Sequence, residues 1–63
     1  MVRLTRRHGD PIWVNPERVV AVFTEEDRDD PGHLDTVLIL TGGRFQKVRE
    51  APEVAVARLE GGS

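Results

Sequence analysis

Hydrophobic and polar residues alternate along this 63-residue chain in short runs separated by turn residues. Residues 2–6 alternate apolar and polar side chains, which is the period of a half-buried strand. A turn cluster with Gly and Pro follows at 8–11, and then a β-branched and aromatic run at 12–14. Pro16 ends that run, because it lacks an N–H and biases the preceding Asn15 away from helix. This pattern predicts an N-terminal β-hairpin.

Burial selects the register of this hairpin, because a slip of one residue turns every side chain to the other face. A loop with an odd number of residues, centred on Gly9, places Leu4 opposite Val14 and Arg6 opposite Ile12. The same register gathers four apolar side chains on one face of the hairpin: Val2, Leu4, Ile12 and Val14.

Three more strands are predicted in the middle of the chain, at 18–24, 35–40 and 44–49. The first is apolar on both faces, which is typical of a central or covered strand. Residues 25–33 separate it from the second as a polar loop, and five of its first six residues are acidic. Such a segment cannot bury itself, so we expect it to be mobile.

The dipeptide Gly-Gly at 42–43 predicts a two-residue hairpin between the last two strands. Both central positions of a type I′ turn need a positive φ, which glycine adopts readily. This turn places Leu40 opposite Phe45 and Val37 opposite Val48.

Residues 52–60 predict a C-terminal helix, with Pro52 in the first turn, Glu53 complementing the helix dipole, and Gly61-Gly62 as its end. A helix of about ten residues is not stable alone in water, so it must dock on the sheet. The whole chain, 1–63, is therefore predicted to be one mainly β domain. Its fold is a small antiparallel meander or partial barrel of about five strands with one short C-terminal helix.

Composition limits what can stabilise so small a domain. A chain of this length buries only about 60% of its unfolded surface, and it has no Cys for disulfides or thiolate metal sites. The strands supply more apolar faces than one short helix covers, so we expect a homo-oligomer or a subunit of a larger assembly. The alternative is a sheet that curls into a partial barrel and buries both faces itself. The predicted protein-contact residues are Trp13, Val20, Val22, Leu38 and Phe45.

The basic residues suggest nucleic-acid binding as a second function. The net charge of −2 argues neither for nor against nucleic-acid binding. However, eight of the nine basic residues are Arg, whose guanidinium group suits bidentate contact with phosphate. This function requires the cations to converge on one face around Trp13, which would offer a stacking surface. The candidate nucleic-acid-binding residues are Arg3, Arg6, Arg7, Arg44 and Lys47.

Catalytic chemistry is not expected. The only Ser is Ser63, and Cys and Tyr are missing, so no nucleophile stands beside a base. The acidic loop lacks the order of acidic residues, Gly and Glu that builds a calcium loop, so no metal or other cofactor is predicted. We also expect no small-molecule substrate and no membrane insertion, since no run of about 20 apolar residues occurs. Residues 1–6 lack a signal-peptide stretch, so we expect a cytoplasmic protein, or a virion-associated one if phage-encoded.

Four segments match the pattern of a known family: VRLTR at 2–6 with Gly9, IWVNPERV at 12–19, TVLILTGGR at 36–44, and VRE at 48–50 followed by Glu53-Val54. Together they resemble the FlbD-type flagellar and swarming motility proteins, over most of the chain. The resemblance implies a non-enzymatic accessory of flagellar motility.

The chain departs from the pattern of this family in three places. The loop from Glu25 to Asp35 is longer and more acidic, and the helix stops at Gly61 before the family's longer basic tail. Ala51 stands where the family has a helix-capping Ser, which weakens that cap. Short actinobacterial or phage relatives without flagella leave open a phage or virion accessory component. A similar β-rich module in LytTR-type DNA-binding domains leaves open a transcription-modulating role.

Overall fold

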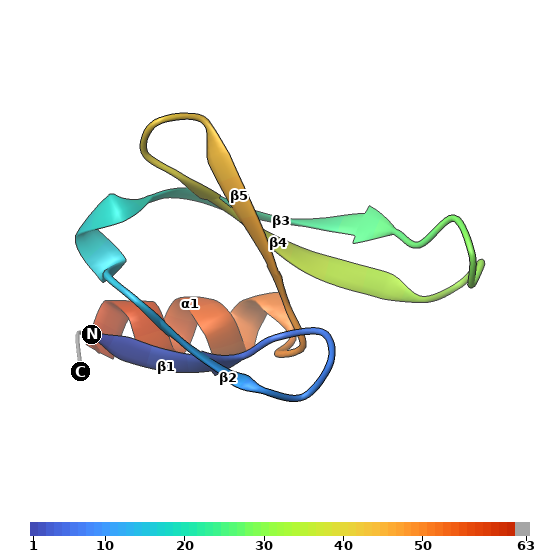
Figure 1. Ribbon diagram of the computed structural model, residues 1–63, viewed down its shortest axis with the longest axis horizontal. Helices are drawn as coiled ribbons and strands as arrows, with labels where there is room; N and C mark the ends of the chain where they lie inside the picture. The colour runs from blue at the N-terminus through green and yellow to red at the C-terminus, as the bar shows by residue number, and fades with distance from the viewer. Residues whose placement is uncertain (62–63) are drawn as a thin grey trace.

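Five antiparallel strands in two open sheets, with one C-terminal helix, make up the computed structural model, which describes residues 1–61 (Figure 1). The predicted mainly β class with a short C-terminal helix is confirmed. The strands form a hairpin sheet and a three-stranded sheet in the order β3-β4-β5, and neither closes into a barrel. The elements are β1 (Val2–Thr5), β2 (Pro11–Val14), the 3₁₀ turn η1 (Pro16–Arg18), β3 (Val19–Glu26), β4 (Leu34–Leu40), β5 (Arg44–Val48) and α1 (Pro52–Gly61).

The register of the β1–β2 hairpin differs from the prediction by two residues. Leu4 lies opposite Ile12, so the predicted pairs Leu4–Val14 and Arg6–Ile12 are wrong. The turn is one residue earlier than expected: the Arg6 N–H donates to the Asp10 carbonyl at 2.8 Å, and five residues separate the strands. A shift of two residues leaves every side chain on its predicted face.

The faces of this hairpin follow the predicted pattern. Val2, Leu4 and Val14 are buried, and Ile12 packs against them. Trp13 lies opposite Arg3 and is exposed, on the other face.

The turn between β4 and β5 is longer than predicted. Thr41, Gly42 and Gly43 all lie outside the strands, and the two glycines have φ values of +87° and +78°. The predicted pairs Leu40–Phe45 and Val37–Val48 are therefore wrong by one residue.

This one-residue difference decides which side of the sheet each β5 side chain occupies. Phe45 lies opposite Ile39, and Gln46 lies opposite Leu38. Because Leu38 belongs to the core, Phe45 projects away from it.

The predicted acidic loop is shorter in the structure than residues 25–33. Glu25 and Glu26 belong to β3, where they pair with Asp35 and Leu34 of β4. The remaining connection, residues 27–33, is closed by a hydrogen bond from the Asp27 N–H to the His33 carbonyl at 2.9 Å.

The helix follows the prediction to within one residue. Its predicted range was 52–60, and α1 runs from Pro52 to Gly61. Gly62, the other residue expected to end the helix, lies outside the described residues.

The core lies between the three-stranded sheet on one side and the hairpin and helix on the other. Figure 1 shows α1 and the β1–β2 hairpin on the same side of the β3–β4–β5 sheet. The two sheets meet where the Arg49 N–H donates to the Thr5 carbonyl at 2.8 Å, next to a bridge between Arg6 and Val48. The buried core residues are Val2, Leu4, Val14, Leu38, Val48 and Ala55, with Ile12, Val19, Val22, Leu40 and Leu59 packed against them.

Candidate interaction surface

The side of the three-stranded sheet that points away from the core carries an apolar surface, which we call the outer face. Its central row places Phe23 opposite Val37, and Ile39 lies between Ala21 and Phe45. Phe45 is 66% exposed and Phe23 is 43% exposed. The outer face consists of Ala21, Phe23, Val37, Ile39 and Phe45.

No element in residues 1–61 covers the outer face, because the helix and the hairpin pack on the opposite side. Val37 is nevertheless only 2% exposed, since it lies between Phe23 on β3 and Lys47 on β5. The outer face is thus a continuous surface with two large aromatic side chains standing above it.

The structure places the five predicted protein-contact residues in different environments. Trp13, Val20 and Phe45 are exposed. Leu38 is 0% exposed, and Val22 packs against the core. The expectation that Leu38 contributes to a contact surface is corrected, because its side chain is fully buried in the core. Sequence reasoning missed Phe23.

Trp13 belongs to a second apolar region, on the hairpin rather than on the outer face. It lines a hollow of about 420 Å³ with Met1, Ile12 and Leu40. Trp13 itself lies on β2, in a different sheet from the outer face.

The five candidate nucleic-acid-binding residues do not converge around Trp13. Only Arg3 pairs directly opposite it. Arg44 lies opposite Leu40 at the tip of the β4–β5 hairpin. Arg6 forms an ion pair with Asp10 at 3.4 Å.

Arg7 and Lys47 are also paired with carboxylates. The Arg7 guanidinium bonds to Asp27 and lies 3.9 Å from Asp35, and the Lys47 ammonium lies 3.8 Å from Asp35. Cations paired in this way contribute less to a basic surface for phosphate groups.

Asp35 is the centre of this charge cluster. Its side chain is 6% exposed, and its Oδ1 lies 3.1 Å from His33 Nε2. Its other oxygen, Oδ2, has no hydrogen-bond partner within residues 1–61, although Arg7 and Lys47 lie within 4 Å. A buried carboxylate is tolerated when cations surround it, so the cluster ties the hairpin turn, β4 and β5 together.

Asp27 anchors the start of the 27–33 connection. Its Oδ1 accepts a hydrogen bond from the Asp29 N–H at 2.9 Å, and its Oδ2 accepts one from Arg7. The Asp29 hydrogen bond, followed by the charge of Arg7, holds the pKa of Asp27 below its ordinary value despite partial burial. The carboxylate form of Asp27 therefore favours the folded state.

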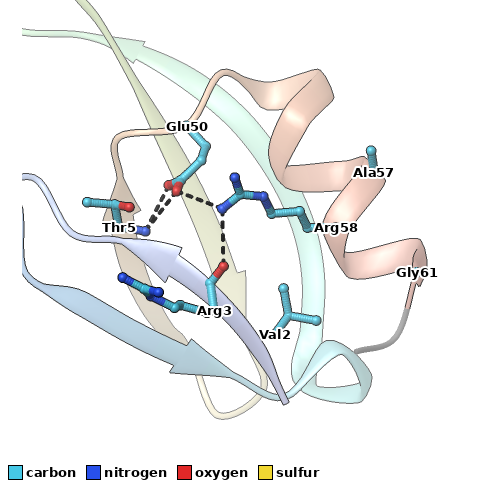
Figure 2. A pocket seen from close by; sticks show the side chains of 7 residues that line it. All are labelled: Val2, Arg3, Thr5, Glu50, Ala57, Arg58 and Gly61. Carbon is cyan, nitrogen blue, oxygen red and sulfur yellow. Dashed lines mark hydrogen bonds and ion pairs between the residues drawn. The ribbon is translucent and has the colours of Figure 1, made fainter.

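Glu50 lies in the segment between β5 and α1 and links this segment to both β1 and α1 (Figure 2). Its two carboxylate oxygens accept from the Thr5 N–H at 2.9 and 3.0 Å, and Arg58 Nη1 donates to Oε2 at 3.1 Å. The same Arg58 nitrogen donates to the Arg3 carbonyl at 3.3 Å. Glu50 and Arg58 thus satisfy backbone groups on the outward edge of β1.

These groups line a hollow of about 610 Å³ beside α1, which also includes Val2 and Ala57. Burial alone would raise the pKa of Glu50, but the hydrogen bond from Thr5 and the charge of Arg58 outweigh burial and lower it. The residues of this hollow are engaged with one another, which is typical of a structural contact.

Within the part of the chain that the structure describes, no group of three or more His, Asp or Glu side chains is placed to hold a metal ion. None of the helices there is both long and apolar enough to cross a membrane.

Comparisons of the chain with protein-family models, curated proteins and solved structures find no match. The geometry of the chain therefore carries the functional argument.

Proposed function

We propose that this chain is a non-enzymatic protein-interaction module that works by contact in the cytoplasm, as a homo-oligomer or as a subunit of a larger assembly. The observation that carries the proposal is the outer face, where Phe23 and Phe45 stand exposed on a sheet surface that no described element covers. Contiguous exposed apolar surfaces of this kind mark interaction sites.

The outer face has the composition of a contact surface. Aromatic side chains supply large buried area and dominate the binding energy of protein interfaces. Glu25 and Lys47 lie on the same side of the sheet at its margin, following the alternation of β3 and β5. An apolar centre with a charged margin is the usual anatomy of an interface.

The resemblance to FlbD-type proteins gives the proposal its named form, an accessory protein of flagellar motility. The support is the pattern of the segments at 2–19 and 36–54, with their two glycine turns. In this form the partner belongs to the motility machinery, and we expect the gene to lie among flagellar genes.

The double substitution Phe23→Ser with Phe45→Ser tests the outer face. In extracts of cells that express the epitope-tagged chain, we expect the wild type to elute in size-exclusion chromatography well above the mass of one chain. The double variant is expected to elute at a clearly lower mass than the wild type, because loss of aromatic anchors weakens binding by about 2 kcal/mol or more.

Val54→Ser is the matched control, since Val54 is an exposed apolar residue on α1 and not on the outer face. It is expected to elute like the wild type. Elution of the double variant, folded by circular dichroism, together with the wild type would contradict the proposed contact surface.

A further inference from the structure

The two open sheets have four outward strand edges, and three of them are protected against pairing with another strand. On β1, Glu50 accepts from the Thr5 N–H and Arg58 donates to the Arg3 carbonyl. The β2 edge contains Pro11, and the short β5 edge carries Arg44 and Lys47. Side-chain caps, proline and charge are the usual means of protecting an edge.

The edge of β3 has neither proline nor charge along most of its length, and a bulge between Val19 and Ala21 interrupts only its start. β3 is eight residues long, and residues 19–24 contain no charge and no proline. Directly after β3, the Asp27 N–H donates to the carbonyl of His33, the residue directly before β4. Because backbone groups alternate along an antiparallel strand, those of Val22, Thr24 and Glu26 point outward from the sheet.

We propose that two copies of this chain pair antiparallel through their β3 edges, around a two-fold axis at Val22, to form a continuous six-stranded sheet. This inference rests on the proposed contact function and names one partner, a second copy. In this register Val22 of each copy exchanges two backbone hydrogen bonds with its counterpart, and Thr24 lies near the bulged residue Val20 of the other copy.

Charge complementarity supports a second copy as the occupant of this edge. β3 is preceded by Arg18 and ends in Glu25 and Glu26, all three exposed. An antiparallel copy brings Arg18 of each chain close to the two glutamates of the other, at both ends of the interface. None of the ion pairs within residues 1–61 uses these three side chains.

A hollow adjoins the β3 edge on the side that faces α1. It has a volume of about 390 Å³ and is lined on the helix side by Val56 and Leu59 and on the strand side by Val20 and Val22. The core-facing side of the paired strands would place the second Val22 next to this hollow. The outer faces of the two copies would also join into one wider surface.

The substitution Thr24→Pro tests the pairing, because it removes only an outward N–H and leaves the ladder to β4 intact. Analytical ultracentrifugation from micromolar to millimolar concentration is expected to show the wild type rising from 7.1 kDa to twice that mass. Thr24→Pro should remain at the mass of one chain, while the control Thr24→Val should behave as the wild type. A folded Thr24→Pro variant that dimerises like the wild type would overturn the inference.

A charge exchange keeps the test decisive if Thr24→Pro fails to fold. Arg18→Glu and Glu26→Arg are each expected to raise the dimer dissociation constant about tenfold, by like-charge contacts at both ends. The combined variant should restore the wild-type constant. If the combined variant is no tighter than the single ones, the β3 register is wrong.

The two proposals fail in different ways. A wild type that stays at 7.1 kDa at every concentration overturns self-pairing but leaves the outer face available to another protein. Loss of the large complex in the Phe23→Ser and Phe45→Ser variant, with dimer mass retained, supports both.

Discussion

Replacement of Leu38 by alanine is expected to lower the free energy of unfolding by about 2–5 kcal/mol. Leu38 is 0% exposed, at the centre of β4, and belongs to the same core cluster as Leu4 and Val48. Truncation leaves a cavity that a small core cannot refill. A chain of 63 residues has a total stability of only about 3–9 kcal/mol, so much of the variant should be unfolded at 25 °C.

Leu34→Ala on the same strand is the matched control. Leu34 is 58% exposed, so the same truncation should cost less than about 1 kcal/mol. Urea denaturation followed by far-ultraviolet circular dichroism measures both changes. Equal losses in the two variants would show that Leu38, at the centre of β4, is no more tightly packed than Leu34 at the exposed end of the same strand.

Glu50→Gln is expected to lower the free energy of unfolding by about 1–3 kcal/mol at pH 7. The substitution weakens the acceptor for the Thr5 N–H and removes the charge that faces Arg58. It therefore loosens the links from the β5–α1 segment to both β1 and α1. Glu60→Gln, at an exposed position of α1, should change stability by no more than about 0.5 kcal/mol.

The effect of Glu50→Gln depends on pH in a defined direction. The pKa of Glu50 is lower in the folded protein than in the unfolded chain, so its stabilisation is complete above the unfolded pKa, about 4.3. The stabilisation is lost as the pH falls through the folded pKa. The difference between wild type and variant should therefore shrink below about pH 4. A difference that grows on acidification would contradict the assigned role of the carboxylate.

For the hairpin, the sequence correctly predicts the buried face. It does not predict which residues of β1 and β2 lie opposite each other. Alternation at Val2 and Leu4 identifies the buried face, and any even shift of register leaves that face unchanged. The position of the turn depends on the local hydrogen bond from Arg6 to Asp10, which side-chain pattern does not encode.

A register error of one residue has larger consequences than an error of two, as the β4–β5 turn shows. A three-residue loop in place of a two-residue one puts Phe45 on the side of the sheet opposite Leu38, and therefore away from the core. Both loops are compatible with Gly42 and Gly43, because either places glycine at positive φ. The outer face could therefore not be assigned correctly from the sequence alone.

Long-range polar contacts were the least predictable part of the structure. Glu50 and Thr5 are 45 residues apart in the chain. The cluster at Asp35 joins Arg7, His33 and Lys47 from three separate segments. Charge in the sequence indicated a mobile acidic loop and a basic surface, whereas packing pairs several of these groups with one another.

Photo-crosslinking from the outer face tests the contact function most directly. A benzophenone amino acid replaces Phe45 in one variant and Glu53, an exposed residue of α1, in a matched variant. After irradiation of the expressing cells, we expect a discrete crosslinked product from position 45, formed with a partner protein or a second copy, and none from position 53. No product from position 45, or the same products from both positions, would contradict the account.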